Sequence, residues 1–518
     1  MRRLLLPIVL LAVAIGAIIQ MNRANEDADP GRAVEVSTEP DLTTPIFSAR
    51  RAPDWLRNPK SDTLLTDAIN AVLRTDATPP LSCVLVERDG EQLAASNINA
   101  QIRTDELHRL ITATVVDAAG SGGGFRTEIA IANDAEIVIV DEETGAAELI
   151  GDVWLIGSGD PGLATQAYAG RFDNGRVFTD FDQLAADAIA ELQARNITAI
   201  RGRVIGDETK YSPVQRDYFD ATVTLDDGEG GSRAFPVWER GFADNDIGPL
   251  SALLLNDGFE SWPEEQETFD QSQNARAGDP AVSAAAYLDD LFEAAGMIVQ
   301  RSAQSGEAPS TAERETLAVV ESPPLSEIIE TSLIDATTAE MLLKEYGVRA
   351  GTDSERFNAV LSLLGSGFVN AGLPYDGVTV PNYHDGSGRS ALNRTSCEWI
   401  HATIADPGGV GATVIPAIAD SAVAGCAAGP GEMHVMATSS GTATGLAGWY
   451  VAPNGERLTF AMLAEDLTRL FPPEDDPEAE PAGPWTPCNT LQAAMIDAIA
   501  GHPYGPELDE LAPLDPAG

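Results

Sequence analysis

The chain has 518 residues, and its 80 Asp+Glu against 32 Lys+Arg give a formal net charge of −48 at pH 7. This charge excludes a main role in binding nucleic-acid phosphates or anionic lipid surfaces. A hydrophobic content of 44% excludes disorder over most of the length. The chain has three lysines, Lys60, Lys210 and Lys344, so any mechanism that needs a lysine base has three candidates.

The N-terminus predicts a targeting segment. Arg2 and Arg3 precede an apolar run over residues 4–19, which is long for a signal-peptide core and slightly short for a membrane span. We expect a signal-anchor in residues 1–22, with a cleaved signal peptide as the alternative and a buried helix as a less favoured one. A signal or anchor places the rest in the periplasm or another extracytoplasmic space, with residues 4–19 as a possible inner-membrane anchor. Residues 23–52 read as a polar linker.

Helical and strand patterns alternate after the linker. Apolar spacing of three and four residues indicates helices, and β-branched runs around Asp89-Gly90 and Pro453-Asn454-Gly455 indicate hairpins. The expected helices cover 65–74, 106–120, 181–197, 279–296, 323–347 (as one or two), 356–372 and 490–501. The expected strands lie in 82–97, 125–143, 151–163, 199–208, 433–440 and 442–466.

This order predicts an α+β fold in which one domain interrupts another. The interrupted domain is expected in two parts, residues 53–126 and 279–471, around a β-rich inserted domain at 127–278. A Pro-rich acidic linker, a short helix and a tail fill 472–518.

The cysteines and histidines give little sign of metal or redox chemistry. No CxxC or HExxH occurs, and the five histidines lack metal-ligand spacing, so no metal or cofactor is expected. In an oxidising compartment the four cysteines, Cys83, Cys397, Cys426 and Cys488, allow two disulfides in three connectivities. Cys397 with Cys426 is the expected pair, and free buried thiols are the alternative.

The sequence contains no GxSxG motif of a serine hydrolase. A Ser-His-Asp triad from distant positions is a weakly favoured alternative, because its members need not be neighbours in the chain.

Six strings in chain order resemble one family. They are LIGSGDPGL (155–163), NDIGPLSALLLND (245–257), ESPPLSEII (321–329), TAEMLLKEYG (338–347), YHDGSGRSALNR (383–394) and SGTATGLAGWYVAPNGERLTFAML (440–463). Single strings are weak signals, but six in one order are specific. Together they are similar to the D-alanyl-D-alanine carboxypeptidase/endopeptidase family, the class C low-molecular-mass penicillin-binding proteins.

The resemblance implies a penicillin-binding/β-lactamase-like transpeptidase-type domain with a large β-rich insert. It also implies an exported peptidase that acts on peptidoglycan stem peptides. The family's chemistry needs three motifs. The Ser of SxxK attacks the substrate carbonyl and its Lys removes the proton, SxN assists proton transfer and holds the substrate amide, and the Lys of KTG attracts the terminal carboxylate.

The positions that match these motifs carry other residues here. They are Glu106 and Arg109 for SxxK, Ile334 and Ala336 for SxN, and Ser439, Gly441 and Thr442 for KTG. The absence does not depend on this alignment. The residues three places before the lysines are Arg57, Asp207 and Met341, and no lysine precedes Thr-Gly or Ser-Gly. Arginine cannot replace the lysine base, because it stays protonated.

Two segments keep the means to bind a ligand. Ser439 and Ser440 would lie at a strand edge that a peptide backbone can pair with. Asp385, Ser387 and Arg389 in DGSGR could meet a carboxylate or a sugar, although a plain tight turn is the favoured interpretation.

The sequence therefore predicts an envelope homologue of these carboxypeptidases, catalytically impaired, that binds peptidoglycan stem peptides or a peptidoglycan enzyme. The alternatives are an active serine-type D,D-carboxypeptidase with an unorthodox site, a non-enzymatic scaffold, and an unrelated hydrolase. Neither a nucleic-acid partner nor a cofactor is expected.

Overall fold

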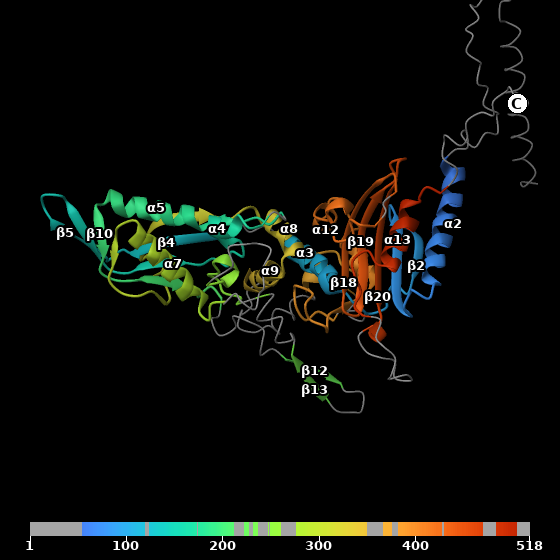
Figure 1. Ribbon diagram of the computed structural model, residues 1–518, viewed down its shortest axis with the longest axis horizontal. Coiled ribbons are helices and arrows are strands. Elements are labelled where there is room, and N and C mark those ends of the chain that lie inside the picture. Colours follow the sequence, from blue (N-terminus) through green and yellow to red (C-terminus); the bar gives the residue numbers. More distant parts are fainter. Residues whose placement is uncertain are drawn as a thin grey trace, which may run out of the picture. The chain divides into compact units, whose positions relative to one another are not determined.

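The computed structural model in Figure 1 describes most of the chain beyond residue 53. The described residues are 54–119, 124–172, 175–211, 222–226, 232–236, 247, 249–260, 276–349, 366–375, 382–426, 429–469 and 483–504. Nearly all of them belong to one compact unit, Arg57–Gly505. The predicted targeting segment and polar linker lie outside the described residues. None of the described helices combines the length and apolar character needed to span a bilayer.

A five-stranded antiparallel sheet joins the two ends of this unit. Its order is β18-β19-β20-β1-β2, with bounds Glu432–Ser440, Ala443–Val451, Arg457–Glu465, Leu81–Arg88 and Glu91–Ser96. β1 pairs with β20, and Leu85 lies opposite Ala461. The expected Asp-Gly turn is confirmed by positive φ angles of 50° at Asp89 and 79° at Gly90, which such two-residue hairpins require.

Helices cover both faces of this sheet. Successive strand residues point to opposite faces, so Val84 and Cys83 of β1 belong to different hydrophobic cores. The Val84 core includes side chains of α2 (Asp54–Leu73) and α13 (Thr490–Ala500). The Cys83 core includes side chains of α3 (His108–Ala118), α8 (Leu325–Ile334), α9 (Ala336–Arg349) and α11 (Cys397–Ala402).

Two of the expected helical segments are resolved in more detail by the structure. The helix expected at 106–120 begins as a 3-10 turn, η2 (Asp105–Leu107), and continues as α3; Gly120 lies outside the described residues. The segment 323–347, expected as one or two helices, forms two, α8 and α9, and the backbone is extended between them at Asp335 (φ −120°, ψ 123°). Of the helix expected at 356–372, only residues from 366 are described, and 366–370 are helical.

Two further sheets lie between β2 and α8 in the chain. One has the order β15-β11-β7-β4-β16 and the other β14-β10-β6-β5. The first has bounds Gln304–Ser305, Val204–Asp207, Val153–Ile156, Arg126–Ala132 and Arg314–Glu321. The second has bounds Ile298–Val299, Ile197–Ile200, Ala146–Ile150 and Glu136–Asp141.

Helices α5 (Phe181–Ala194) and α7 (Pro280–Ala294) pack in the core of these sheets. Each begins after an aspartate, Asp180 or Asp279, whose carboxylate accepts a backbone N–H of the first turn. Residues on both sides of the predicted boundary at 278 thus share one core. The division of the chain into domains stays a prediction.

The remaining elements are short. The small strand pairs are β3 (Ile102–Arg103) with β17 (Arg394–Thr395), β8 (Leu163–Ala164) with β9 (Thr179–Asp180), and β12 (Thr222–Asp226) with β13 (Ser232–Pro236). The short helices are α4 (Gln166–Ala169), η5 (Asn256–Gly258), α12 (Val410–Thr413), η8 (Ile418–Asp420) and η9 (Leu467–Arg469).

Both disulfides differ from the expected Cys397–Cys426 pair, which is wrong. Cys83 bonds to Cys397 and Cys426 bonds to Cys488. The reason is the sheet: Cys397 begins α11 in the core on the Cys83 face, whereas Cys426 lies in the core on the other face. Two disulfides indicate an oxidising, extracytoplasmic compartment.

Candidate functional site

The residues that the sequence matches to the first and third motifs meet in the structure. Glu106 lies in η2 and Arg109 in the first turn of α3, while Ser439 lies in β18. The Glu106 carboxylate (Oε2) accepts a hydrogen bond from the hydroxyl of Thr438, the neighbour of Ser439, at 2.5 Å. The start of the first helix is therefore bridged directly to the strand that carries the KTG-like residues.

Glu106 is an ionised carboxylate with both oxygens engaged. Its second oxygen, Oε1, accepts from Nη1 of Arg389 at 3.2 Å. Burial raises the pKa of Glu106, but Arg109, the Thr438 hydroxyl and Arg389 together outweigh burial and lower the pKa below its ordinary value. At neutral pH this position presents a charge that is already paired.

Arg109 is a buried structural cation with 3% exposure. Its Nε donates to the carbonyl oxygen of Ser387 at 2.8 Å, and its Nη1 donates to that of Leu333 at 2.9 Å. Burial lowers the pKa of Arg109, and the charge of Glu106 opposes this shift. The side chain thus ties α3 to the end of α8 and to the DGSG loop, and as a guanidinium it offers donors but no lone pair for a proton.

The junction of α8 and α9 carries the SxN-like positions without their polar groups. Ile334 is 49% exposed and Ala336 is buried, and neither side chain can hold a substrate amide. Between them, Asp335 accepts from the N–H and hydroxyl of Thr338 at 2.7 and 2.6 Å, and it pairs with Arg176 at 3.5 Å. Burial raises the pKa of Asp335, but Arg176 and Thr338 outweigh burial, and the net pKa lies below its ordinary value. The carboxylate is therefore ionised and caps α9.

The KTG-like residues end an edge strand. β18 is the outer strand of its sheet, and Ser439 pairs with Thr444 of β19. The Ser439 hydroxyl is buried and has no hydrogen-bond partner among the described residues. Gly441 makes the turn with a φ of 51°, and Thr442 is buried. The side chain of Ser440 lies outside the description.

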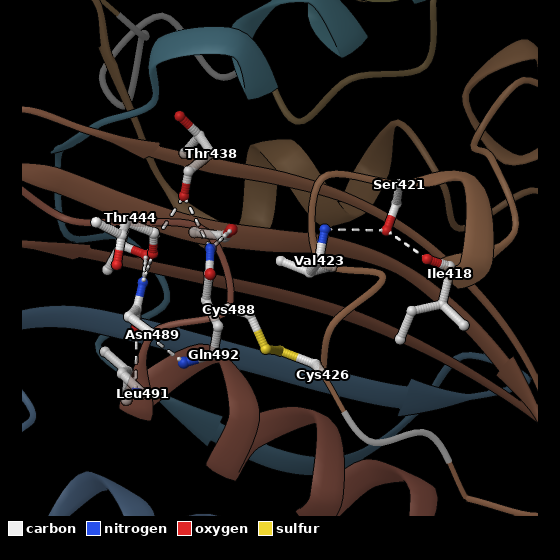
Figure 2. The surroundings of a disulfide bond; sticks show 12 residues. Ile418, Ser421, Val423, Cys426, Thr438, Thr444, Cys488, Asn489, Leu491 and Gln492 are labelled. Carbon is white, nitrogen blue, oxygen red and sulfur yellow. Dashed lines mark hydrogen bonds between the residues drawn. A yellow bond between two sulfur atoms is a disulfide. The ribbon is translucent and has the colours of Figure 1, made fainter.

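Helix α13 holds this strand pair next to the second disulfide, as Figure 2 shows. Gln492 donates to the Thr438 carbonyl at 2.9 Å, and Asn489 donates to the Thr444 hydroxyl at 2.9 Å. Cys488, directly before Asn489, is bonded to Cys426. The edge strand is therefore fixed in place by neutral hydrogen bonds.

The DGSG segment is a closed turn. Asp385 is fully buried and accepts from the N–H groups of Gly388 and Ser390 and from the Asn393 amide, at 2.6–2.8 Å. A Cβ at Gly388, where φ is 80°, would lie 1.9 Å from the Asp105 carbonyl oxygen. Asp385 and the buried Ser387 are thus used within the loop, and Arg389 connects the loop to Glu106. Ligand binding by these residues stays a prediction.

Sequence reasoning missed one buried acid beneath this turn. The Oε1 atom of Glu340 accepts the N–H groups of Gly386 and Ser387 at 2.9 and 2.7 Å. Burial, followed by the nearby Asp385, raises the pKa of Glu340 to about 8. Its signal in the sequence is a lone glutamate among the apolar residues of TAEMLL, where the helical spacing predicts burial.

Two of the three lysines connect α9 to the long segment between β2 and α8. Lys344 is buried and donates to the Leu250 carbonyl at 2.9 Å. Lys210 pairs with Glu345 at 2.8 Å. Lys60 is exposed on α2. No cluster of three or more His, Cys, Asp and Glu side chains that could hold a metal ion occurs in the part of the chain that the structure describes.

Comparison with known proteins agrees with this architecture. Two crystal structures of penicillin-binding protein 4 from Haemophilus influenzae match the fold. The first has a TM-score of 0.54 and 15% identity and covers 77% of this chain and 93% of that protein. The second, a complex with a β-lactam, has a TM-score of 0.51 and 12% identity and covers 82% and 97%. These matches confirm the expected penicillin-binding-type α+β fold.

Sequence comparison points in the same direction. No curated protein matches the chain. Residues 261–476, which include the SxN-like, DGSG and KTG-like segments, match the D-Ala-D-Ala carboxypeptidase 3 (S13) family. Over residues 261–476 the chain is therefore similar to the D-Ala-D-Ala carboxypeptidase family S13, and the ordered strings and the shared fold agree with that similarity.

Proposed function

We propose that this protein binds peptidoglycan stem peptides, or an enzyme that acts on them, without forming an acyl-enzyme. One observation carries the proposal: a paired carboxylate and a buried guanidinium lie at the positions that the sequence comparison above matches to the family's nucleophile and base. Glu106 is bound by Thr438 and Arg389, and Arg109 is bound by two backbone carbonyls.

The chemical argument is about proton transfer. A serine hydroxyl becomes a useful nucleophile when a neighbouring base takes its proton. The guanidinium of Arg109 stays protonated near neutral pH and cannot act as that base. The ionised Glu106 accepts one hydrogen bond on each oxygen, from the Thr438 hydroxyl and from the Arg389 guanidinium.

Peptide binding is supported by what the site keeps. β18 is an edge strand, and an extended peptide can add to such an edge through backbone hydrogen bonds that need no particular side chain. The family that residues 261–476 match is described as a D-Ala-D-Ala carboxypeptidase family, which supports a peptide ligand of that type. We place the protein in the periplasm or an equivalent extracytoplasmic space, with residues 4–19 as its anchor, because of its two disulfides and its apolar N-terminus.

Labelling by a fluorescent penicillin tests the absence of acylation. We expect no covalent label on the purified protein and no D-alanine released from a pentapeptide, while a serine penicillin-binding protein assayed in parallel shows both. A stable adduct or released D-alanine would establish the alternative, an active enzyme with an unorthodox site.

Binding of a stem pentapeptide, measured by calorimetry, tests the retained function. The variant Ser439→Lys places a cation at the KTG-like position and should strengthen binding of a peptide with a free terminal carboxylate. The Ser439→Gln variant, of similar length but neutral, should not. If neither the protein nor the lysine variant binds the peptide, and no envelope peptidoglycan enzyme binds either, the proposed role is wrong.

A further inference from the structure

In the described part of the chain, the strand β5 (Glu136–Asp141) forms an apolar edge of its sheet. Its sequence is EIVIVD, and it is the outermost strand of the sheet β14-β10-β6-β5, labelled in Figure 1. All six residues are exposed. The exposed fractions are 43% for Ile137, 42% for Val138, 64% for Ile139 and 52% for Val140. Among the described residues, β6 is the strand that pairs with it.

Both sides of this strand are apolar. Ile137 and Ile139 lie opposite Leu149 and Ala147 of β6, which are buried in the core. The apolar face of the sheet therefore extends from the buried β6 onto the exposed β5. Among the described strands none pairs with the outer edge of β5, so the outward backbone N–H and C=O groups of that edge have no strand partner there. Long apolar edge strands are normally shielded, since they recruit other strands.

We propose that β5 binds an extended segment of a partner protein by strand addition, and that this segment is apolar in the middle and basic at its ends. The apolar run of β5 is bounded by Glu136 and Asp141, and Glu142 and Glu143 follow. Lysines or arginines at the ends of an added strand would face these carboxylates. The binding is separate from the proposed function, because it involves a different sheet.

The same charges disfavour a second copy of this chain. Antiparallel pairing of two β5 strands in register sets Glu136 opposite Asp141 at both ends, and like charges directly opposite in a sheet are destabilising. Two copies also each carry a charge of −48. The acidic flanks therefore disfavour this pairing of two copies and favour a strand with basic ends.

Fluorescence anisotropy on the purified full chain tests the proposal with three labelled peptides. Each has a centre of alternating valine and threonine. One has two lysines at each end, one has two glutamates instead, and one is the lysine peptide with alternate backbone amides methylated. We expect the lysine peptide to bind at least about tenfold more tightly than the other two, since they lose charge pairing or backbone pairing.

Variants of the strand complete the test. Ile139→Ser and Glu136→Gln/Glu142→Gln should each weaken binding of the lysine peptide, and the first should preserve its salt dependence while the second reduces it. Leu467→Ser, at a residue that is 58% exposed on η9, is the matched control and should bind normally. Because these side chains are exposed, we expect the substitutions to leave the melting temperature unchanged. An unchanged melting temperature will show that each variant is folded.

Three results would overturn the proposal. They are equal binding of the lysine and glutamate peptides, undiminished binding of the methylated peptide, and undiminished binding by Ile139→Ser. Sedimentation that reveals a dimer lost in Ile139→Ser would also overturn it, because the occupant would then be a second copy.

Discussion

Replacing Arg109 with Met tests whether this arginine holds the site together. The change removes the donors to the Ser387 and Leu333 carbonyls at 2.8 and 2.9 Å and deprives Glu106 of a nearby cation. Each hydrogen bond from a charged group contributes roughly 1.5–3 kcal/mol, and Arg109 makes two of them to buried carbonyls. We expect the free energy of unfolding to fall by about 3–5 kcal/mol.

Urea unfolding followed by circular dichroism measures this loss, with Arg126→Met as the matched control. The Arg126 side chain is 51% exposed and pairs with Glu128 at 3.0 Å, so its loss should cost at most about 1 kcal/mol. Arg109→Lys should fall between the two, because one ammonium group keeps the charge without the guanidinium's fork of donors. If Arg109→Met costs no more than the control, the assignment of Arg109 as a structural cation is refuted.

Two further predictions concern pH and cross-links. Burial and the nearby Asp385 raise the pKa of Glu340 in the folded protein from 4.5 to about 8. The folded state therefore holds this proton more tightly than the unfolded state does. The resulting contribution to the free energy of unfolding is fully present below about pH 4.5 and is lost as the pH rises through 8. Glu340→Gln should therefore flatten the decline in melting temperature between pH 6 and 9, and an unchanged decline would contradict this origin. Cys83→Ser/Cys397→Ser should cost about 1.4 kcal/mol more in urea unfolding than Cys426→Ser/Cys488→Ser, because the cross-linked separations are 314 and 62 residues. Equal losses would show that the length of the closed loop does not control the difference.

Local patterns were sufficient for most of the elements. The Asp89-Gly90 turn, the final hairpin, α5, α7 and α13 all lie where apolar spacing and turn residues place them. These signals depend on neighbours within one or two turns of chain, so the sequence carries them directly. Apolar spacing does not decide between one helix and two at 323–347, because the Asp335 carboxylate at the break caps α9 and also pairs with the distant Arg176.

The sequence also predicts some features of the candidate site and leaves others to the structure. Counting lysines and their neighbours in the sequence excludes SxxK and KTG without any structure. It could not show that Glu106 contacts Thr438, which lies 332 positions away, or that Arg109 donates to the Ser387 carbonyl. Nor could it find Glu340 beneath the DGSG turn.

The sequence by itself determined the composition, the order of elements, the family resemblance and the missing motifs, since each is a property of neighbouring residues. The tertiary structure alone decided which cysteines pair, what Arg109 binds and which apolar strand lies at a sheet edge among the described residues. Cys83 and Cys397 are 314 residues apart, yet they meet because β1 and α11 share one core. Such contacts depend on how the sheet brings distant segments to the same face, and the local spacing of apolar residues does not specify that arrangement.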